Sequence, residues 1–245
     1  MKAKRIDQNV QSAIKPSSIK ITDYEVYVRS NLRTKNHTEM ESNSTEEIIY
    51  IYTEAIYDKN EYLAYLAQGA STEDLIDRST LSDAELVIHL KNLFNRSCDA
   101  ILAQGIEIDT IYGKKDFSCK LEDQINLTQL HNGIQANTTE IDYHGNGDKC
   151  RLYPITEFAQ IIAGVTAMVY QQTAYCNLLK SYIETANRDT NLSINYGFIP
   201  SQEFAQELKE LIQRGLNTMK VTLRSPNEAY NQVIDTIITQ FENQI

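Results

Sequence analysis

The residue types that could do chemistry are scattered along this chain. Its four cysteines, Cys98, Cys119, Cys150 and Cys176, form no Cys-x-x-Cys pair and have no histidine at zinc-ligand spacing. His89 falls in a predicted helix and has no second histidine or carboxylate pattern beside it. We interpret the cysteines as buried free thiols and His89 as a structural or solvated side chain. The sequence therefore predicts no catalytic, cofactor-binding or metal-binding residues.

Acidic pairs and one glycine-rich turn are the remaining sources of chemistry. A glycosidase needs two carboxylates that flank one cleft. The available pairs are Glu46 with Glu47, Asp58 with Glu61, Glu73 with Asp74, and Glu122 with Asp123. Solvated surface acids are the favoured interpretation. The turn Gly145–Asp148 lacks the alternating ligands and closing glutamate of a calcium loop, so we predict no metal site, no cofactor and no enzyme activity.

Composition indicates a folded protein that does not bind nucleic acid. Hydrophobic residues make up 42% of the 245 residues and charged residues 23%, which argues against wholesale disorder. A net charge of −10 would repel phosphate backbones, and the only basic cluster is Lys2, Lys4 and Arg5. The sequence has no signal-peptide pattern and no run of about 18 apolar residues. We expect no nucleic-acid partner, no membrane insertion, and folding in a cytoplasm.

The first 69 residues predict an arm and a small sheet. Residues 1–18 are polar and end in a Pro-Ser-Ser breaker cluster, which favours an extended N-terminal arm that reaches an adjacent subunit. Residues 19–69 predict a strand–strand–helix unit, because apolar alternation appears twice before a helix that Gly69 would stop. The predicted elements are strands over Ile19–Val28, with a slip at Thr22-Asp23, and over Ile48–Tyr57, a polar loop over Asn31–Thr45, and a helix over Asp58–Gln68.

Residues 70–186 predict a helical connector and then a larger unit. In the connector, residues 70–105, Ser82 and Glu85 form a capping box that starts a helix ending at Gly105. The unit over residues 106–186 combines two hairpins, a polar helix and a long helix. Its elements are hairpins over Ile108–Cys119 and Ile141–Tyr153, a helix over Leu121–Asn137, and a long helix from Thr156 to about Ala186.

The long helix carries apolar residues at alternating spacings of three and four, which leaves two alternatives open. The pattern is heptad-like, so the helix could supercoil in a symmetric homo-oligomer, with Gln172 as a polar register position. It could equally pack on the two hairpins as the core of its own chain. The residues predicted as interface anchors are Phe158, Val165, Met168, Tyr175 and Tyr182.

Residues 187–245 predict a C-terminal helical lobe. The predicted elements are a polar loop over Asn187–Pro200, a helix from Ser201 to about Asn217, a strand over Met219–Leu223, and an amphipathic helix that starts at Ser225-Pro226-Asn227-Glu228. Taken together, the elements predict an α+β fold: small antiparallel hairpins with several helices, one of them long and heptad-like.

Several motifs resemble an uncharacterised domain of tailed-phage tail-region proteins. They are Ile108–Gly113, Phe117-Ser118, Leu121–Leu127, Tyr143-His144 with the glycine-rich turn, Cys150-Arg151, Phe158 and Tyr175–Asn177, so the likeness covers residues 106–186. The pattern from Ile19–Asp23 through Tyr57–Tyr62 also resembles the opening of tail-locus proteins in phages of Gram-positive bacteria. Residues beyond Asn187 have no counterpart in this resemblance.

The resemblance implies a structural role and no catalytic residues. It implies a subunit of a phage tail tip, baseplate or fibre attachment that contacts other tail or baseplate proteins. Such a chain would be assembled in the bacterial host cytoplasm and reside in the virion tail. Two alternatives stay open: a tail-fibre assembly chaperone that is absent from the mature particle, and, less favoured, a cell-wall glycan hydrolase.

Overall fold

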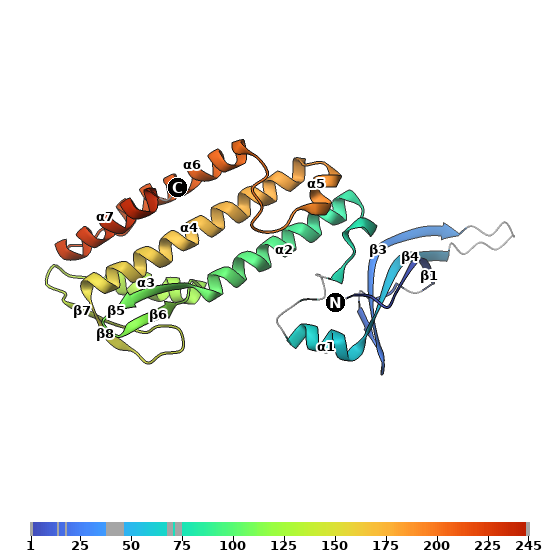
Figure 1. Cartoon of the computed structure of the whole chain (residues 1–245), viewed down its shortest axis with the longest axis horizontal. Coiled ribbons are helices and arrows are strands. Elements are labelled where there is room, and N and C mark those ends of the chain that lie inside the picture. Colours follow the sequence, from blue (N-terminus) through green and yellow to red (C-terminus); the bar gives the residue numbers. More distant parts are fainter. Residues whose placement is uncertain are drawn as a thin grey trace. The chain divides into compact units, whose positions relative to one another are not determined.

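The computed structural model describes residues 2–13, 15–17, 19–37, 47–67, 71 and 75–243, and the chain has the predicted α+β fold (Figure 1). It divides into two compact units. Unit 1 comprises Met1–Leu93 and Ala186–Ile194, and unit 2 comprises Phe94–Thr185 and Asn195–Ile245. This division differs from the five predicted segments. Residues 187–245 form no separate lobe, because their first helix belongs to unit 1 and their other two helices belong to unit 2.

Unit 1 contains a four-stranded antiparallel sheet with the order β1-β4-β3-β2. Its strands are β1 (Arg5–Ser12), β2 (Ile19–Ile21), β3 (Glu25–His37) and β4 (Glu47–Asp58). The predicted slip at Thr22-Asp23 is a turn between β2 and β3, in which the Thr22 hydroxyl donates to the Glu25 carbonyl at 2.9 Å. The second predicted strand is confirmed as β4, and this turn divides the first into β2 and β3.

Two predictions in this sheet need correction. The N-terminal segment is extended, but β1 pairs with β4 of its own chain instead of forming a free arm. The predicted loop from Asn31 is strand as far as His37, because the backbone of β3 stays paired with β4 over this stretch. The residues are mostly polar, so the sequence shows no apolar alternation that would predict a strand. Residues 38–45 of that loop, and the predicted stop at Gly69, lie outside the described residues.

The two faces of this sheet differ in chemistry. Val26, Val28 and Tyr57 lie in an apolar cluster with Tyr62 of α1 (Lys59–Ala67). On the opposite face, Arg29 forms an ion pair with Glu54 at 2.7 Å, and both side chains are nearly buried. The Arg29 guanidinium also lies 5.4 Å from the centre of the Tyr52 ring. One face is thus stabilised by apolar burial and the other by a shielded charge pair.

The helical part of unit 1 is joined by arginines that donate to backbone carbonyls. It comprises a 3-10 helix over Arg78–Thr80, the first part of α2 (Asp83–Gln104) and α5 (Arg188–Ser193). The predicted capping box is confirmed, since the Ser82 N–H donates to the Glu85 carboxylate at 2.8 Å. Arg78 donates to the Ile194 carbonyl and Arg188 to the Leu81 carbonyl, both at 2.7 Å.

Helix α5 lies where a loop was predicted. The segment is polar, but Asn187 caps it by accepting a hydrogen bond from the Thr190 N–H at 2.9 Å. Its Arg188 then fixes the helix by the backbone contacts described above. A short helix of this kind depends on caps and tertiary contacts, and its sequence carries no apolar periodicity that would predict it.

Unit 2 is built around one long helix. Its elements are β5 (Ile106–Thr110), β6 (Gly113–Phe117), α3 (Leu121–Asn132), β7 (Glu140–Tyr143), β8 (Arg151–Pro154), α4 (Ile155–Thr185), α6 (Gln202–Thr222) and α7 (Glu228–Glu242). Both predicted hairpins are confirmed as antiparallel pairs, β5 with β6 and β7 with β8. The predicted helix stop at Gly105 is also confirmed: its φ is +76°, and a Cβ there would overlap the Phe117 carbonyl.

The packing around α4 explains the core of unit 2. In Figure 1, α6 and α7 run along one side of α4, and the hairpins lie near its first turns. Phe158 and Ile161 of α4, Leu127 of α3, Leu216 of α6 and Ile234 of α7 meet in one apolar cluster. Helix α3 ends five residues before its predicted end, at Asn132.

The predicted strand over Met219–Leu223 is wrong, because α6 continues through it to Thr222. Met219 and Leu223 are buried one helical turn apart, while Val221 between them is exposed. Met219, Val221 and Leu223 are separated by polar residues, so the sequence fits the two-residue period of a strand. Met219 and Leu223 also have the four-residue spacing of a helix. Packing against α4 selects the helix.

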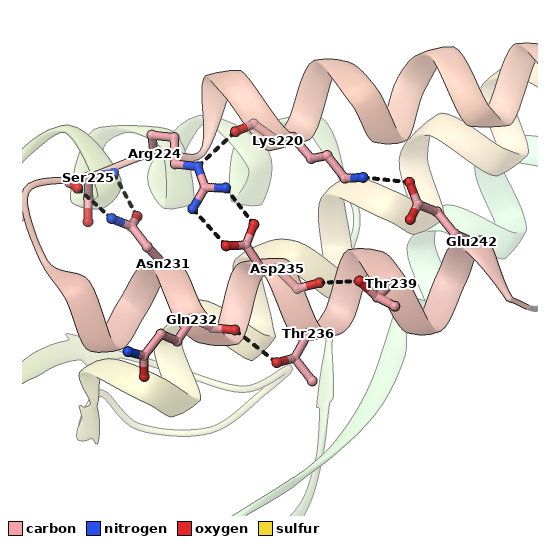
Figure 2. Close-up of polar contacts among 9 residues, drawn as sticks. All are labelled: Lys220, Arg224, Ser225, Asn231, Gln232, Asp235, Thr236, Thr239 and Glu242. Carbon is pink, nitrogen blue, oxygen red and sulfur yellow. Dashed lines mark hydrogen bonds and ion pairs between the residues drawn. The ribbon is translucent and has the colours of Figure 1, made fainter.

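The connection between α6 and α7 is held by side chains that reach across the turn (Figure 2). Arg224 donates to Asp235 at 3.1 Å, and Lys220 donates to Glu242 at 2.7 Å. The cap of α7 is Asn227, whose side chain accepts from the Tyr230 N–H at 3.0 Å, so the helix begins at Glu228, three residues after the predicted start at Ser225. The two last helices therefore form a tight antiparallel pair against α4.

Candidate interaction surface

The predicted interface anchors lie along α4, and three of the five face the interior of unit 2. Phe158 is fully buried and Val165 is 1% exposed. Tyr175 is buried too: its hydroxyl donates to the Phe198 carbonyl at 2.9 Å and accepts from the Gly197 N–H at 2.7 Å. While the unit is folded, these three side chains are not available to another chain.

The remaining two anchors are half-buried. Tyr182 packs edge-on against Phe204 of α6, with ring centres 6.0 Å apart. Gln172, expected to set the register of a supercoil, accepts a hydrogen bond from the Tyr196 hydroxyl of its own chain at 3.2 Å. Of the two predicted alternatives, α4 is therefore an intrachain core helix. Its seam is covered by α6 and α7, which the periodicity of α4 did not reveal; a homo-oligomer through other surfaces stays a prediction.

Met168, the fifth anchor, lines an open groove between β5, α4 and α7. The groove has a volume of about 570 Å³. Four consecutive residues of β5, Ile106–Asp109, form one side, and Ile237 and Phe241 of α7 form the other. Gly164 and Met168 of α4 lie between them. We call this the β5–α7 groove; it joins residues far apart in the sequence.

The rim of the β5–α7 groove is acidic. Glu107 and Asp109 are its two charged lining residues, and both are exposed. Glu107 forms an ion pair with Lys114 of β6, and the hydrogen bond from this pair raises the pKa of Lys114. Asp109 is the direct cross-strand neighbour of the same lysine. One lysine thus lies beside two carboxylates, which leaves the rim with a net negative charge.

A second cavity, of about 340 Å³, lies between α3, α4 and the end of α6. Thr128 and Thr166 contribute hydroxyls, and each donates to a carbonyl of its own helix, Gln124 at 2.8 Å and Ile162 at 2.7 Å. The side chains lining this cavity carry no formal charge when His131 is neutral. It could accept an uncharged group but offers no carboxylate or ammonium for acid–base chemistry.

His131, the histidine of this cavity, is held by structural contacts. Its Nδ1 lies 3.1 Å from the Tyr230 hydroxyl, and the ring also hydrogen-bonds to the Thr222 backbone. Burial lowers the pKa of His131, and the Thr222 hydrogen bond only partly opposes this. Burial likewise raises the pKa of Tyr230. With its ring neutral, His131 joins α3 to α6 and α7, so its role is structural.

A third, shallower cavity brings His144 and Cys150 together with Asp142. His144 Nδ1 lies 3.1 Å from the Gly145 carbonyl. Cys150 is exposed, whereas Cys98, Cys119 and Cys176 are buried, so the expectation of buried thiols is wrong for Cys150 alone. Cys150 lies between Lys149 and Arg151, directly after the polar turn Gly145–Asp148, and this position keeps it at the surface.

The thiols and His89 give no assembled site within the described residues. Burial raises the pKa of Cys119 and of Cys176 to about 11, so both are protonated at neutral pH. His89 is buried in α2. In the part of the chain that the structure describes, no group of three or more His, Cys, Asp or Glu side chains could hold a metal ion.

Within residues 106–186 of unit 2, large apolar side chains are exposed in two places. At the ends of the hairpins, Ile111 is 62% exposed, and the neighbouring Tyr112 donates from its hydroxyl to the Leu152 carbonyl at 2.8 Å. On the first turns of α3, Leu121 is 69% exposed and Ile125 lies one turn further along the same face. Both side chains point away from the buried Leu127 of the same helix.

The groove was missed from the sequence because its two walls come from distant segments. Ile237 and Phe241 belong to the helix that was predicted to be amphipathic, but nothing in its local sequence indicates that it lies opposite β5. The sign available in the sequence was the wide apolar stripe of this helix. When a neighbouring element covers only part of such a stripe, the residues at its edge stay accessible.

Comparisons with models of protein families, with curated proteins and with solved structures gave no match. Among the described helices, none is both long and apolar enough to span a bilayer.

Proposed function

We propose that this chain is a structural subunit of a phage tail tip, baseplate or fibre attachment, acting through protein–protein contacts and without enzymatic activity. The observation that carries the proposal is the exposure of large apolar side chains in the segment that resembles tail-region proteins. These are Ile111, Tyr112, Leu121, Ile125 and Leu152. Exposed apolar groups of this kind are typical of contact surfaces, and aromatic residues are enriched at interface centres.

The hairpins that carry part of this surface are fixed before any partner binds. The Asn146 N–H donates to the Asp116 carbonyl at 2.6 Å, joining the turn of one hairpin to a strand of the other. Lys115 and Asp148 form an ion pair at 2.7 Å across the same contact, which lowers the pKa of Asp148. A preorganised surface loses little conformational entropy on binding, which suits a permanent assembly contact.

The proposed partners are other tail or baseplate proteins, further copies of this chain, or both. Nucleic acid and membrane are not among them, in keeping with the net charge of −10. The proposed location is the virion tail, reached after assembly in the bacterial host cytoplasm.

The experiment that tests the proposal is quantitative mass spectrometry of purified particles from cells that carry the gene. We expect the chain in fixed stoichiometry to the tail proteins. Absence from particles, together with binding to fibre chains in the lysate, would establish the assembly-chaperone alternative instead. Release of cell-wall glycan by the purified chain would establish the hydrolase.

A matched pair of variants connects the exposed surface to assembly. Leu121→Glu places a charge in the exposed apolar group on α3, and we expect it to reduce incorporation into particles by about tenfold. Val221→Glu makes the same change at an equally exposed position on α6, outside the segment of resemblance, and should incorporate normally. Light scattering of both purified variants shows whether a homo-oligomer depends on the same surface.

A further inference from the structure

Strand β5 has a free outer edge that opens into the β5–α7 groove. Among the described strands, β5 pairs with β6 alone. All four residues of Ile106–Asp109 line the groove, although successive side chains of a strand point to opposite faces. A groove that touches all four must therefore run along the edge of the strand, where backbone donors and acceptors are unpaired.

The floor of the groove suits the side chains of an added strand. Gly164 lets β5 lie close to α4, because a Cβ at this position would be 2.5 Å from Cδ1 of Ile106. Beyond it, Met168, Ile237 and Phe241 are half-buried and offer apolar surface. Since alternate residues of a strand face the same way, every second side chain of an incoming strand would meet this floor.

The charge of the rim indicates which strands fit. Glu107 and Asp109 lie on β5 itself, and the lining residues include no lysine, arginine or histidine. Asp116 lies two residues beyond their shared neighbour Lys114 on β6, is the cross-strand partner of Glu107, and adds a third carboxylate. A cation on the incoming strand would therefore meet a rim with a net negative charge, and an acidic strand would be repelled.

We propose that the β5–α7 groove receives an extended segment of a partner protein as a third strand beside β5. Main-chain hydrogen bonds to β5 provide the register, alternate apolar side chains cover Met168, Ile237 and Phe241, and a lysine or arginine lies beside Glu107 and Asp109. This is β-strand addition to an exposed sheet edge. The inference rests on the proposed function, because it names the partner chemistry of one surface of the same subunit.

The test selects displayed random 12-residue peptides against the purified full chain. We expect the enriched peptides to share alternating apolar residues and at least one lysine or arginine. Selection of peptides without a basic residue, or failure to enrich any sequence, would overturn the proposal. Neither result bears on incorporation into particles, so the inference can fail while the proposed function stands.

Two matched pairs of variants place the selected peptides in the groove. Gln240→Trp fills the groove from the exposed side of α7, and Gln232→Trp makes the same change two turns earlier on that helix, away from the groove. Asp109→Lys reverses a rim charge, and Glu207→Lys makes the same kind of change at an exposed position on α6, outside the groove lining. We expect the first member of each pair to weaken binding by about tenfold or more and its control by less than about twofold.

Amide hydrogen exchange separates strand addition from other ways of filling the groove. Binding of a selected peptide should slow exchange at outward-facing amides of Ile106–Thr110, while α7 amides, already bonded within their helix, change little. A peptide that needs the groove but leaves β5 amides unprotected would refute the third strand. Circular dichroism melting of each variant confirms that a loss of binding is not a loss of folding.

Discussion

The two units of this chain bury different chemistry. Unit 2 has an apolar core in which α4 meets α3, α6, α7 and both hairpins. Unit 1 pairs a smaller apolar cluster on one face of its sheet with the shielded Arg29–Glu54 pair on the other. An apolar side chain can be buried against many different apolar neighbours, whereas a buried charged side chain depends on its one oppositely charged neighbour. Unit 2 should therefore respond to lost volume, and unit 1 to the loss of a single polar group.

The largest effect is expected from Phe158→Ala in unit 2. Phe158 is fully buried, so its removal should lower the free energy of unfolding by about 4 kcal/mol, measured by guanidinium denaturation followed by circular dichroism. The control is Tyr182→Ala, since the half-buried Tyr182 was predicted as an interface anchor on the same helix and should cost less. If Phe158→Ala left stability unchanged but dissociated an oligomer, the intrachain assignment of α4 would be wrong.

Breaking the ion pair of unit 1 should have the next largest effect. Glu54→Gln leaves the nearly buried Arg29 without its counter-charge, and we expect a loss of about 3 kcal/mol in the unfolding transition of unit 1. The double variant Arg29→Met/Glu54→Leu removes both charges and should recover most of that loss. If the double variant were as unstable as Glu54→Gln, the two side chains would stabilise the fold by more than neutralising each other's charge. The expected difference between the two units would then be smaller.

A smaller effect should appear in unit 2 on acidification, where His131 is a polar exception in the core. Its pKa is lowered in the folded state, so the unfolded chain binds more protons as the pH falls below 6.5. Stability is therefore complete above pH 6.5 and is lost as the pH falls toward the folded pKa. Urea midpoints at pH 7.5 and 5.5 should differ more for wild type than for His131→Gln.

The carboxylates provide an internal check on this pH window. Asp58 and Asp148 have lowered pKa values because of Lys4 and Lys115, and their contribution is lost only as the pH falls below about 3.8. A loss of stability near pH 6 that persisted in His131→Gln would have to come from another group.

The smallest effect is expected at the exposed pairs between α6 and α7 (Figure 2). Arg224 and Asp235 are about half exposed, unlike Arg29 and Glu54. Arg224→Met should therefore cost about 0.5 kcal/mol, and less at high salt. A cost as large as that of Glu54→Gln would mean that burial does not explain the difference between the two pairs.

Local signals predicted the elements whose ends are fixed by nearby residues. The capping box at Ser82 and Glu85 and the stop at Gly105 depend on contacts and backbone conformation within a few residues, and both lie where they were predicted. The extension of β3, the helix α5 and the continuation of α6 were missed. Each of these depends on a partner elsewhere in the chain: β4, the backbone near Leu81, and α4.

The sequence by itself determined the α+β class, the two hairpins and the length of α4, because turn residues, caps and apolar spacing act over one or two turns of chain. Only the tertiary structure decided what α4 packs against and where apolar surface stays exposed. The same apolar stripe on α4 could pack against another copy of the chain or against α6 and α7, since apolar burial is non-directional and does not specify the partner. The β5–α7 groove follows from that choice, because its two walls meet only after α7 has packed on α4.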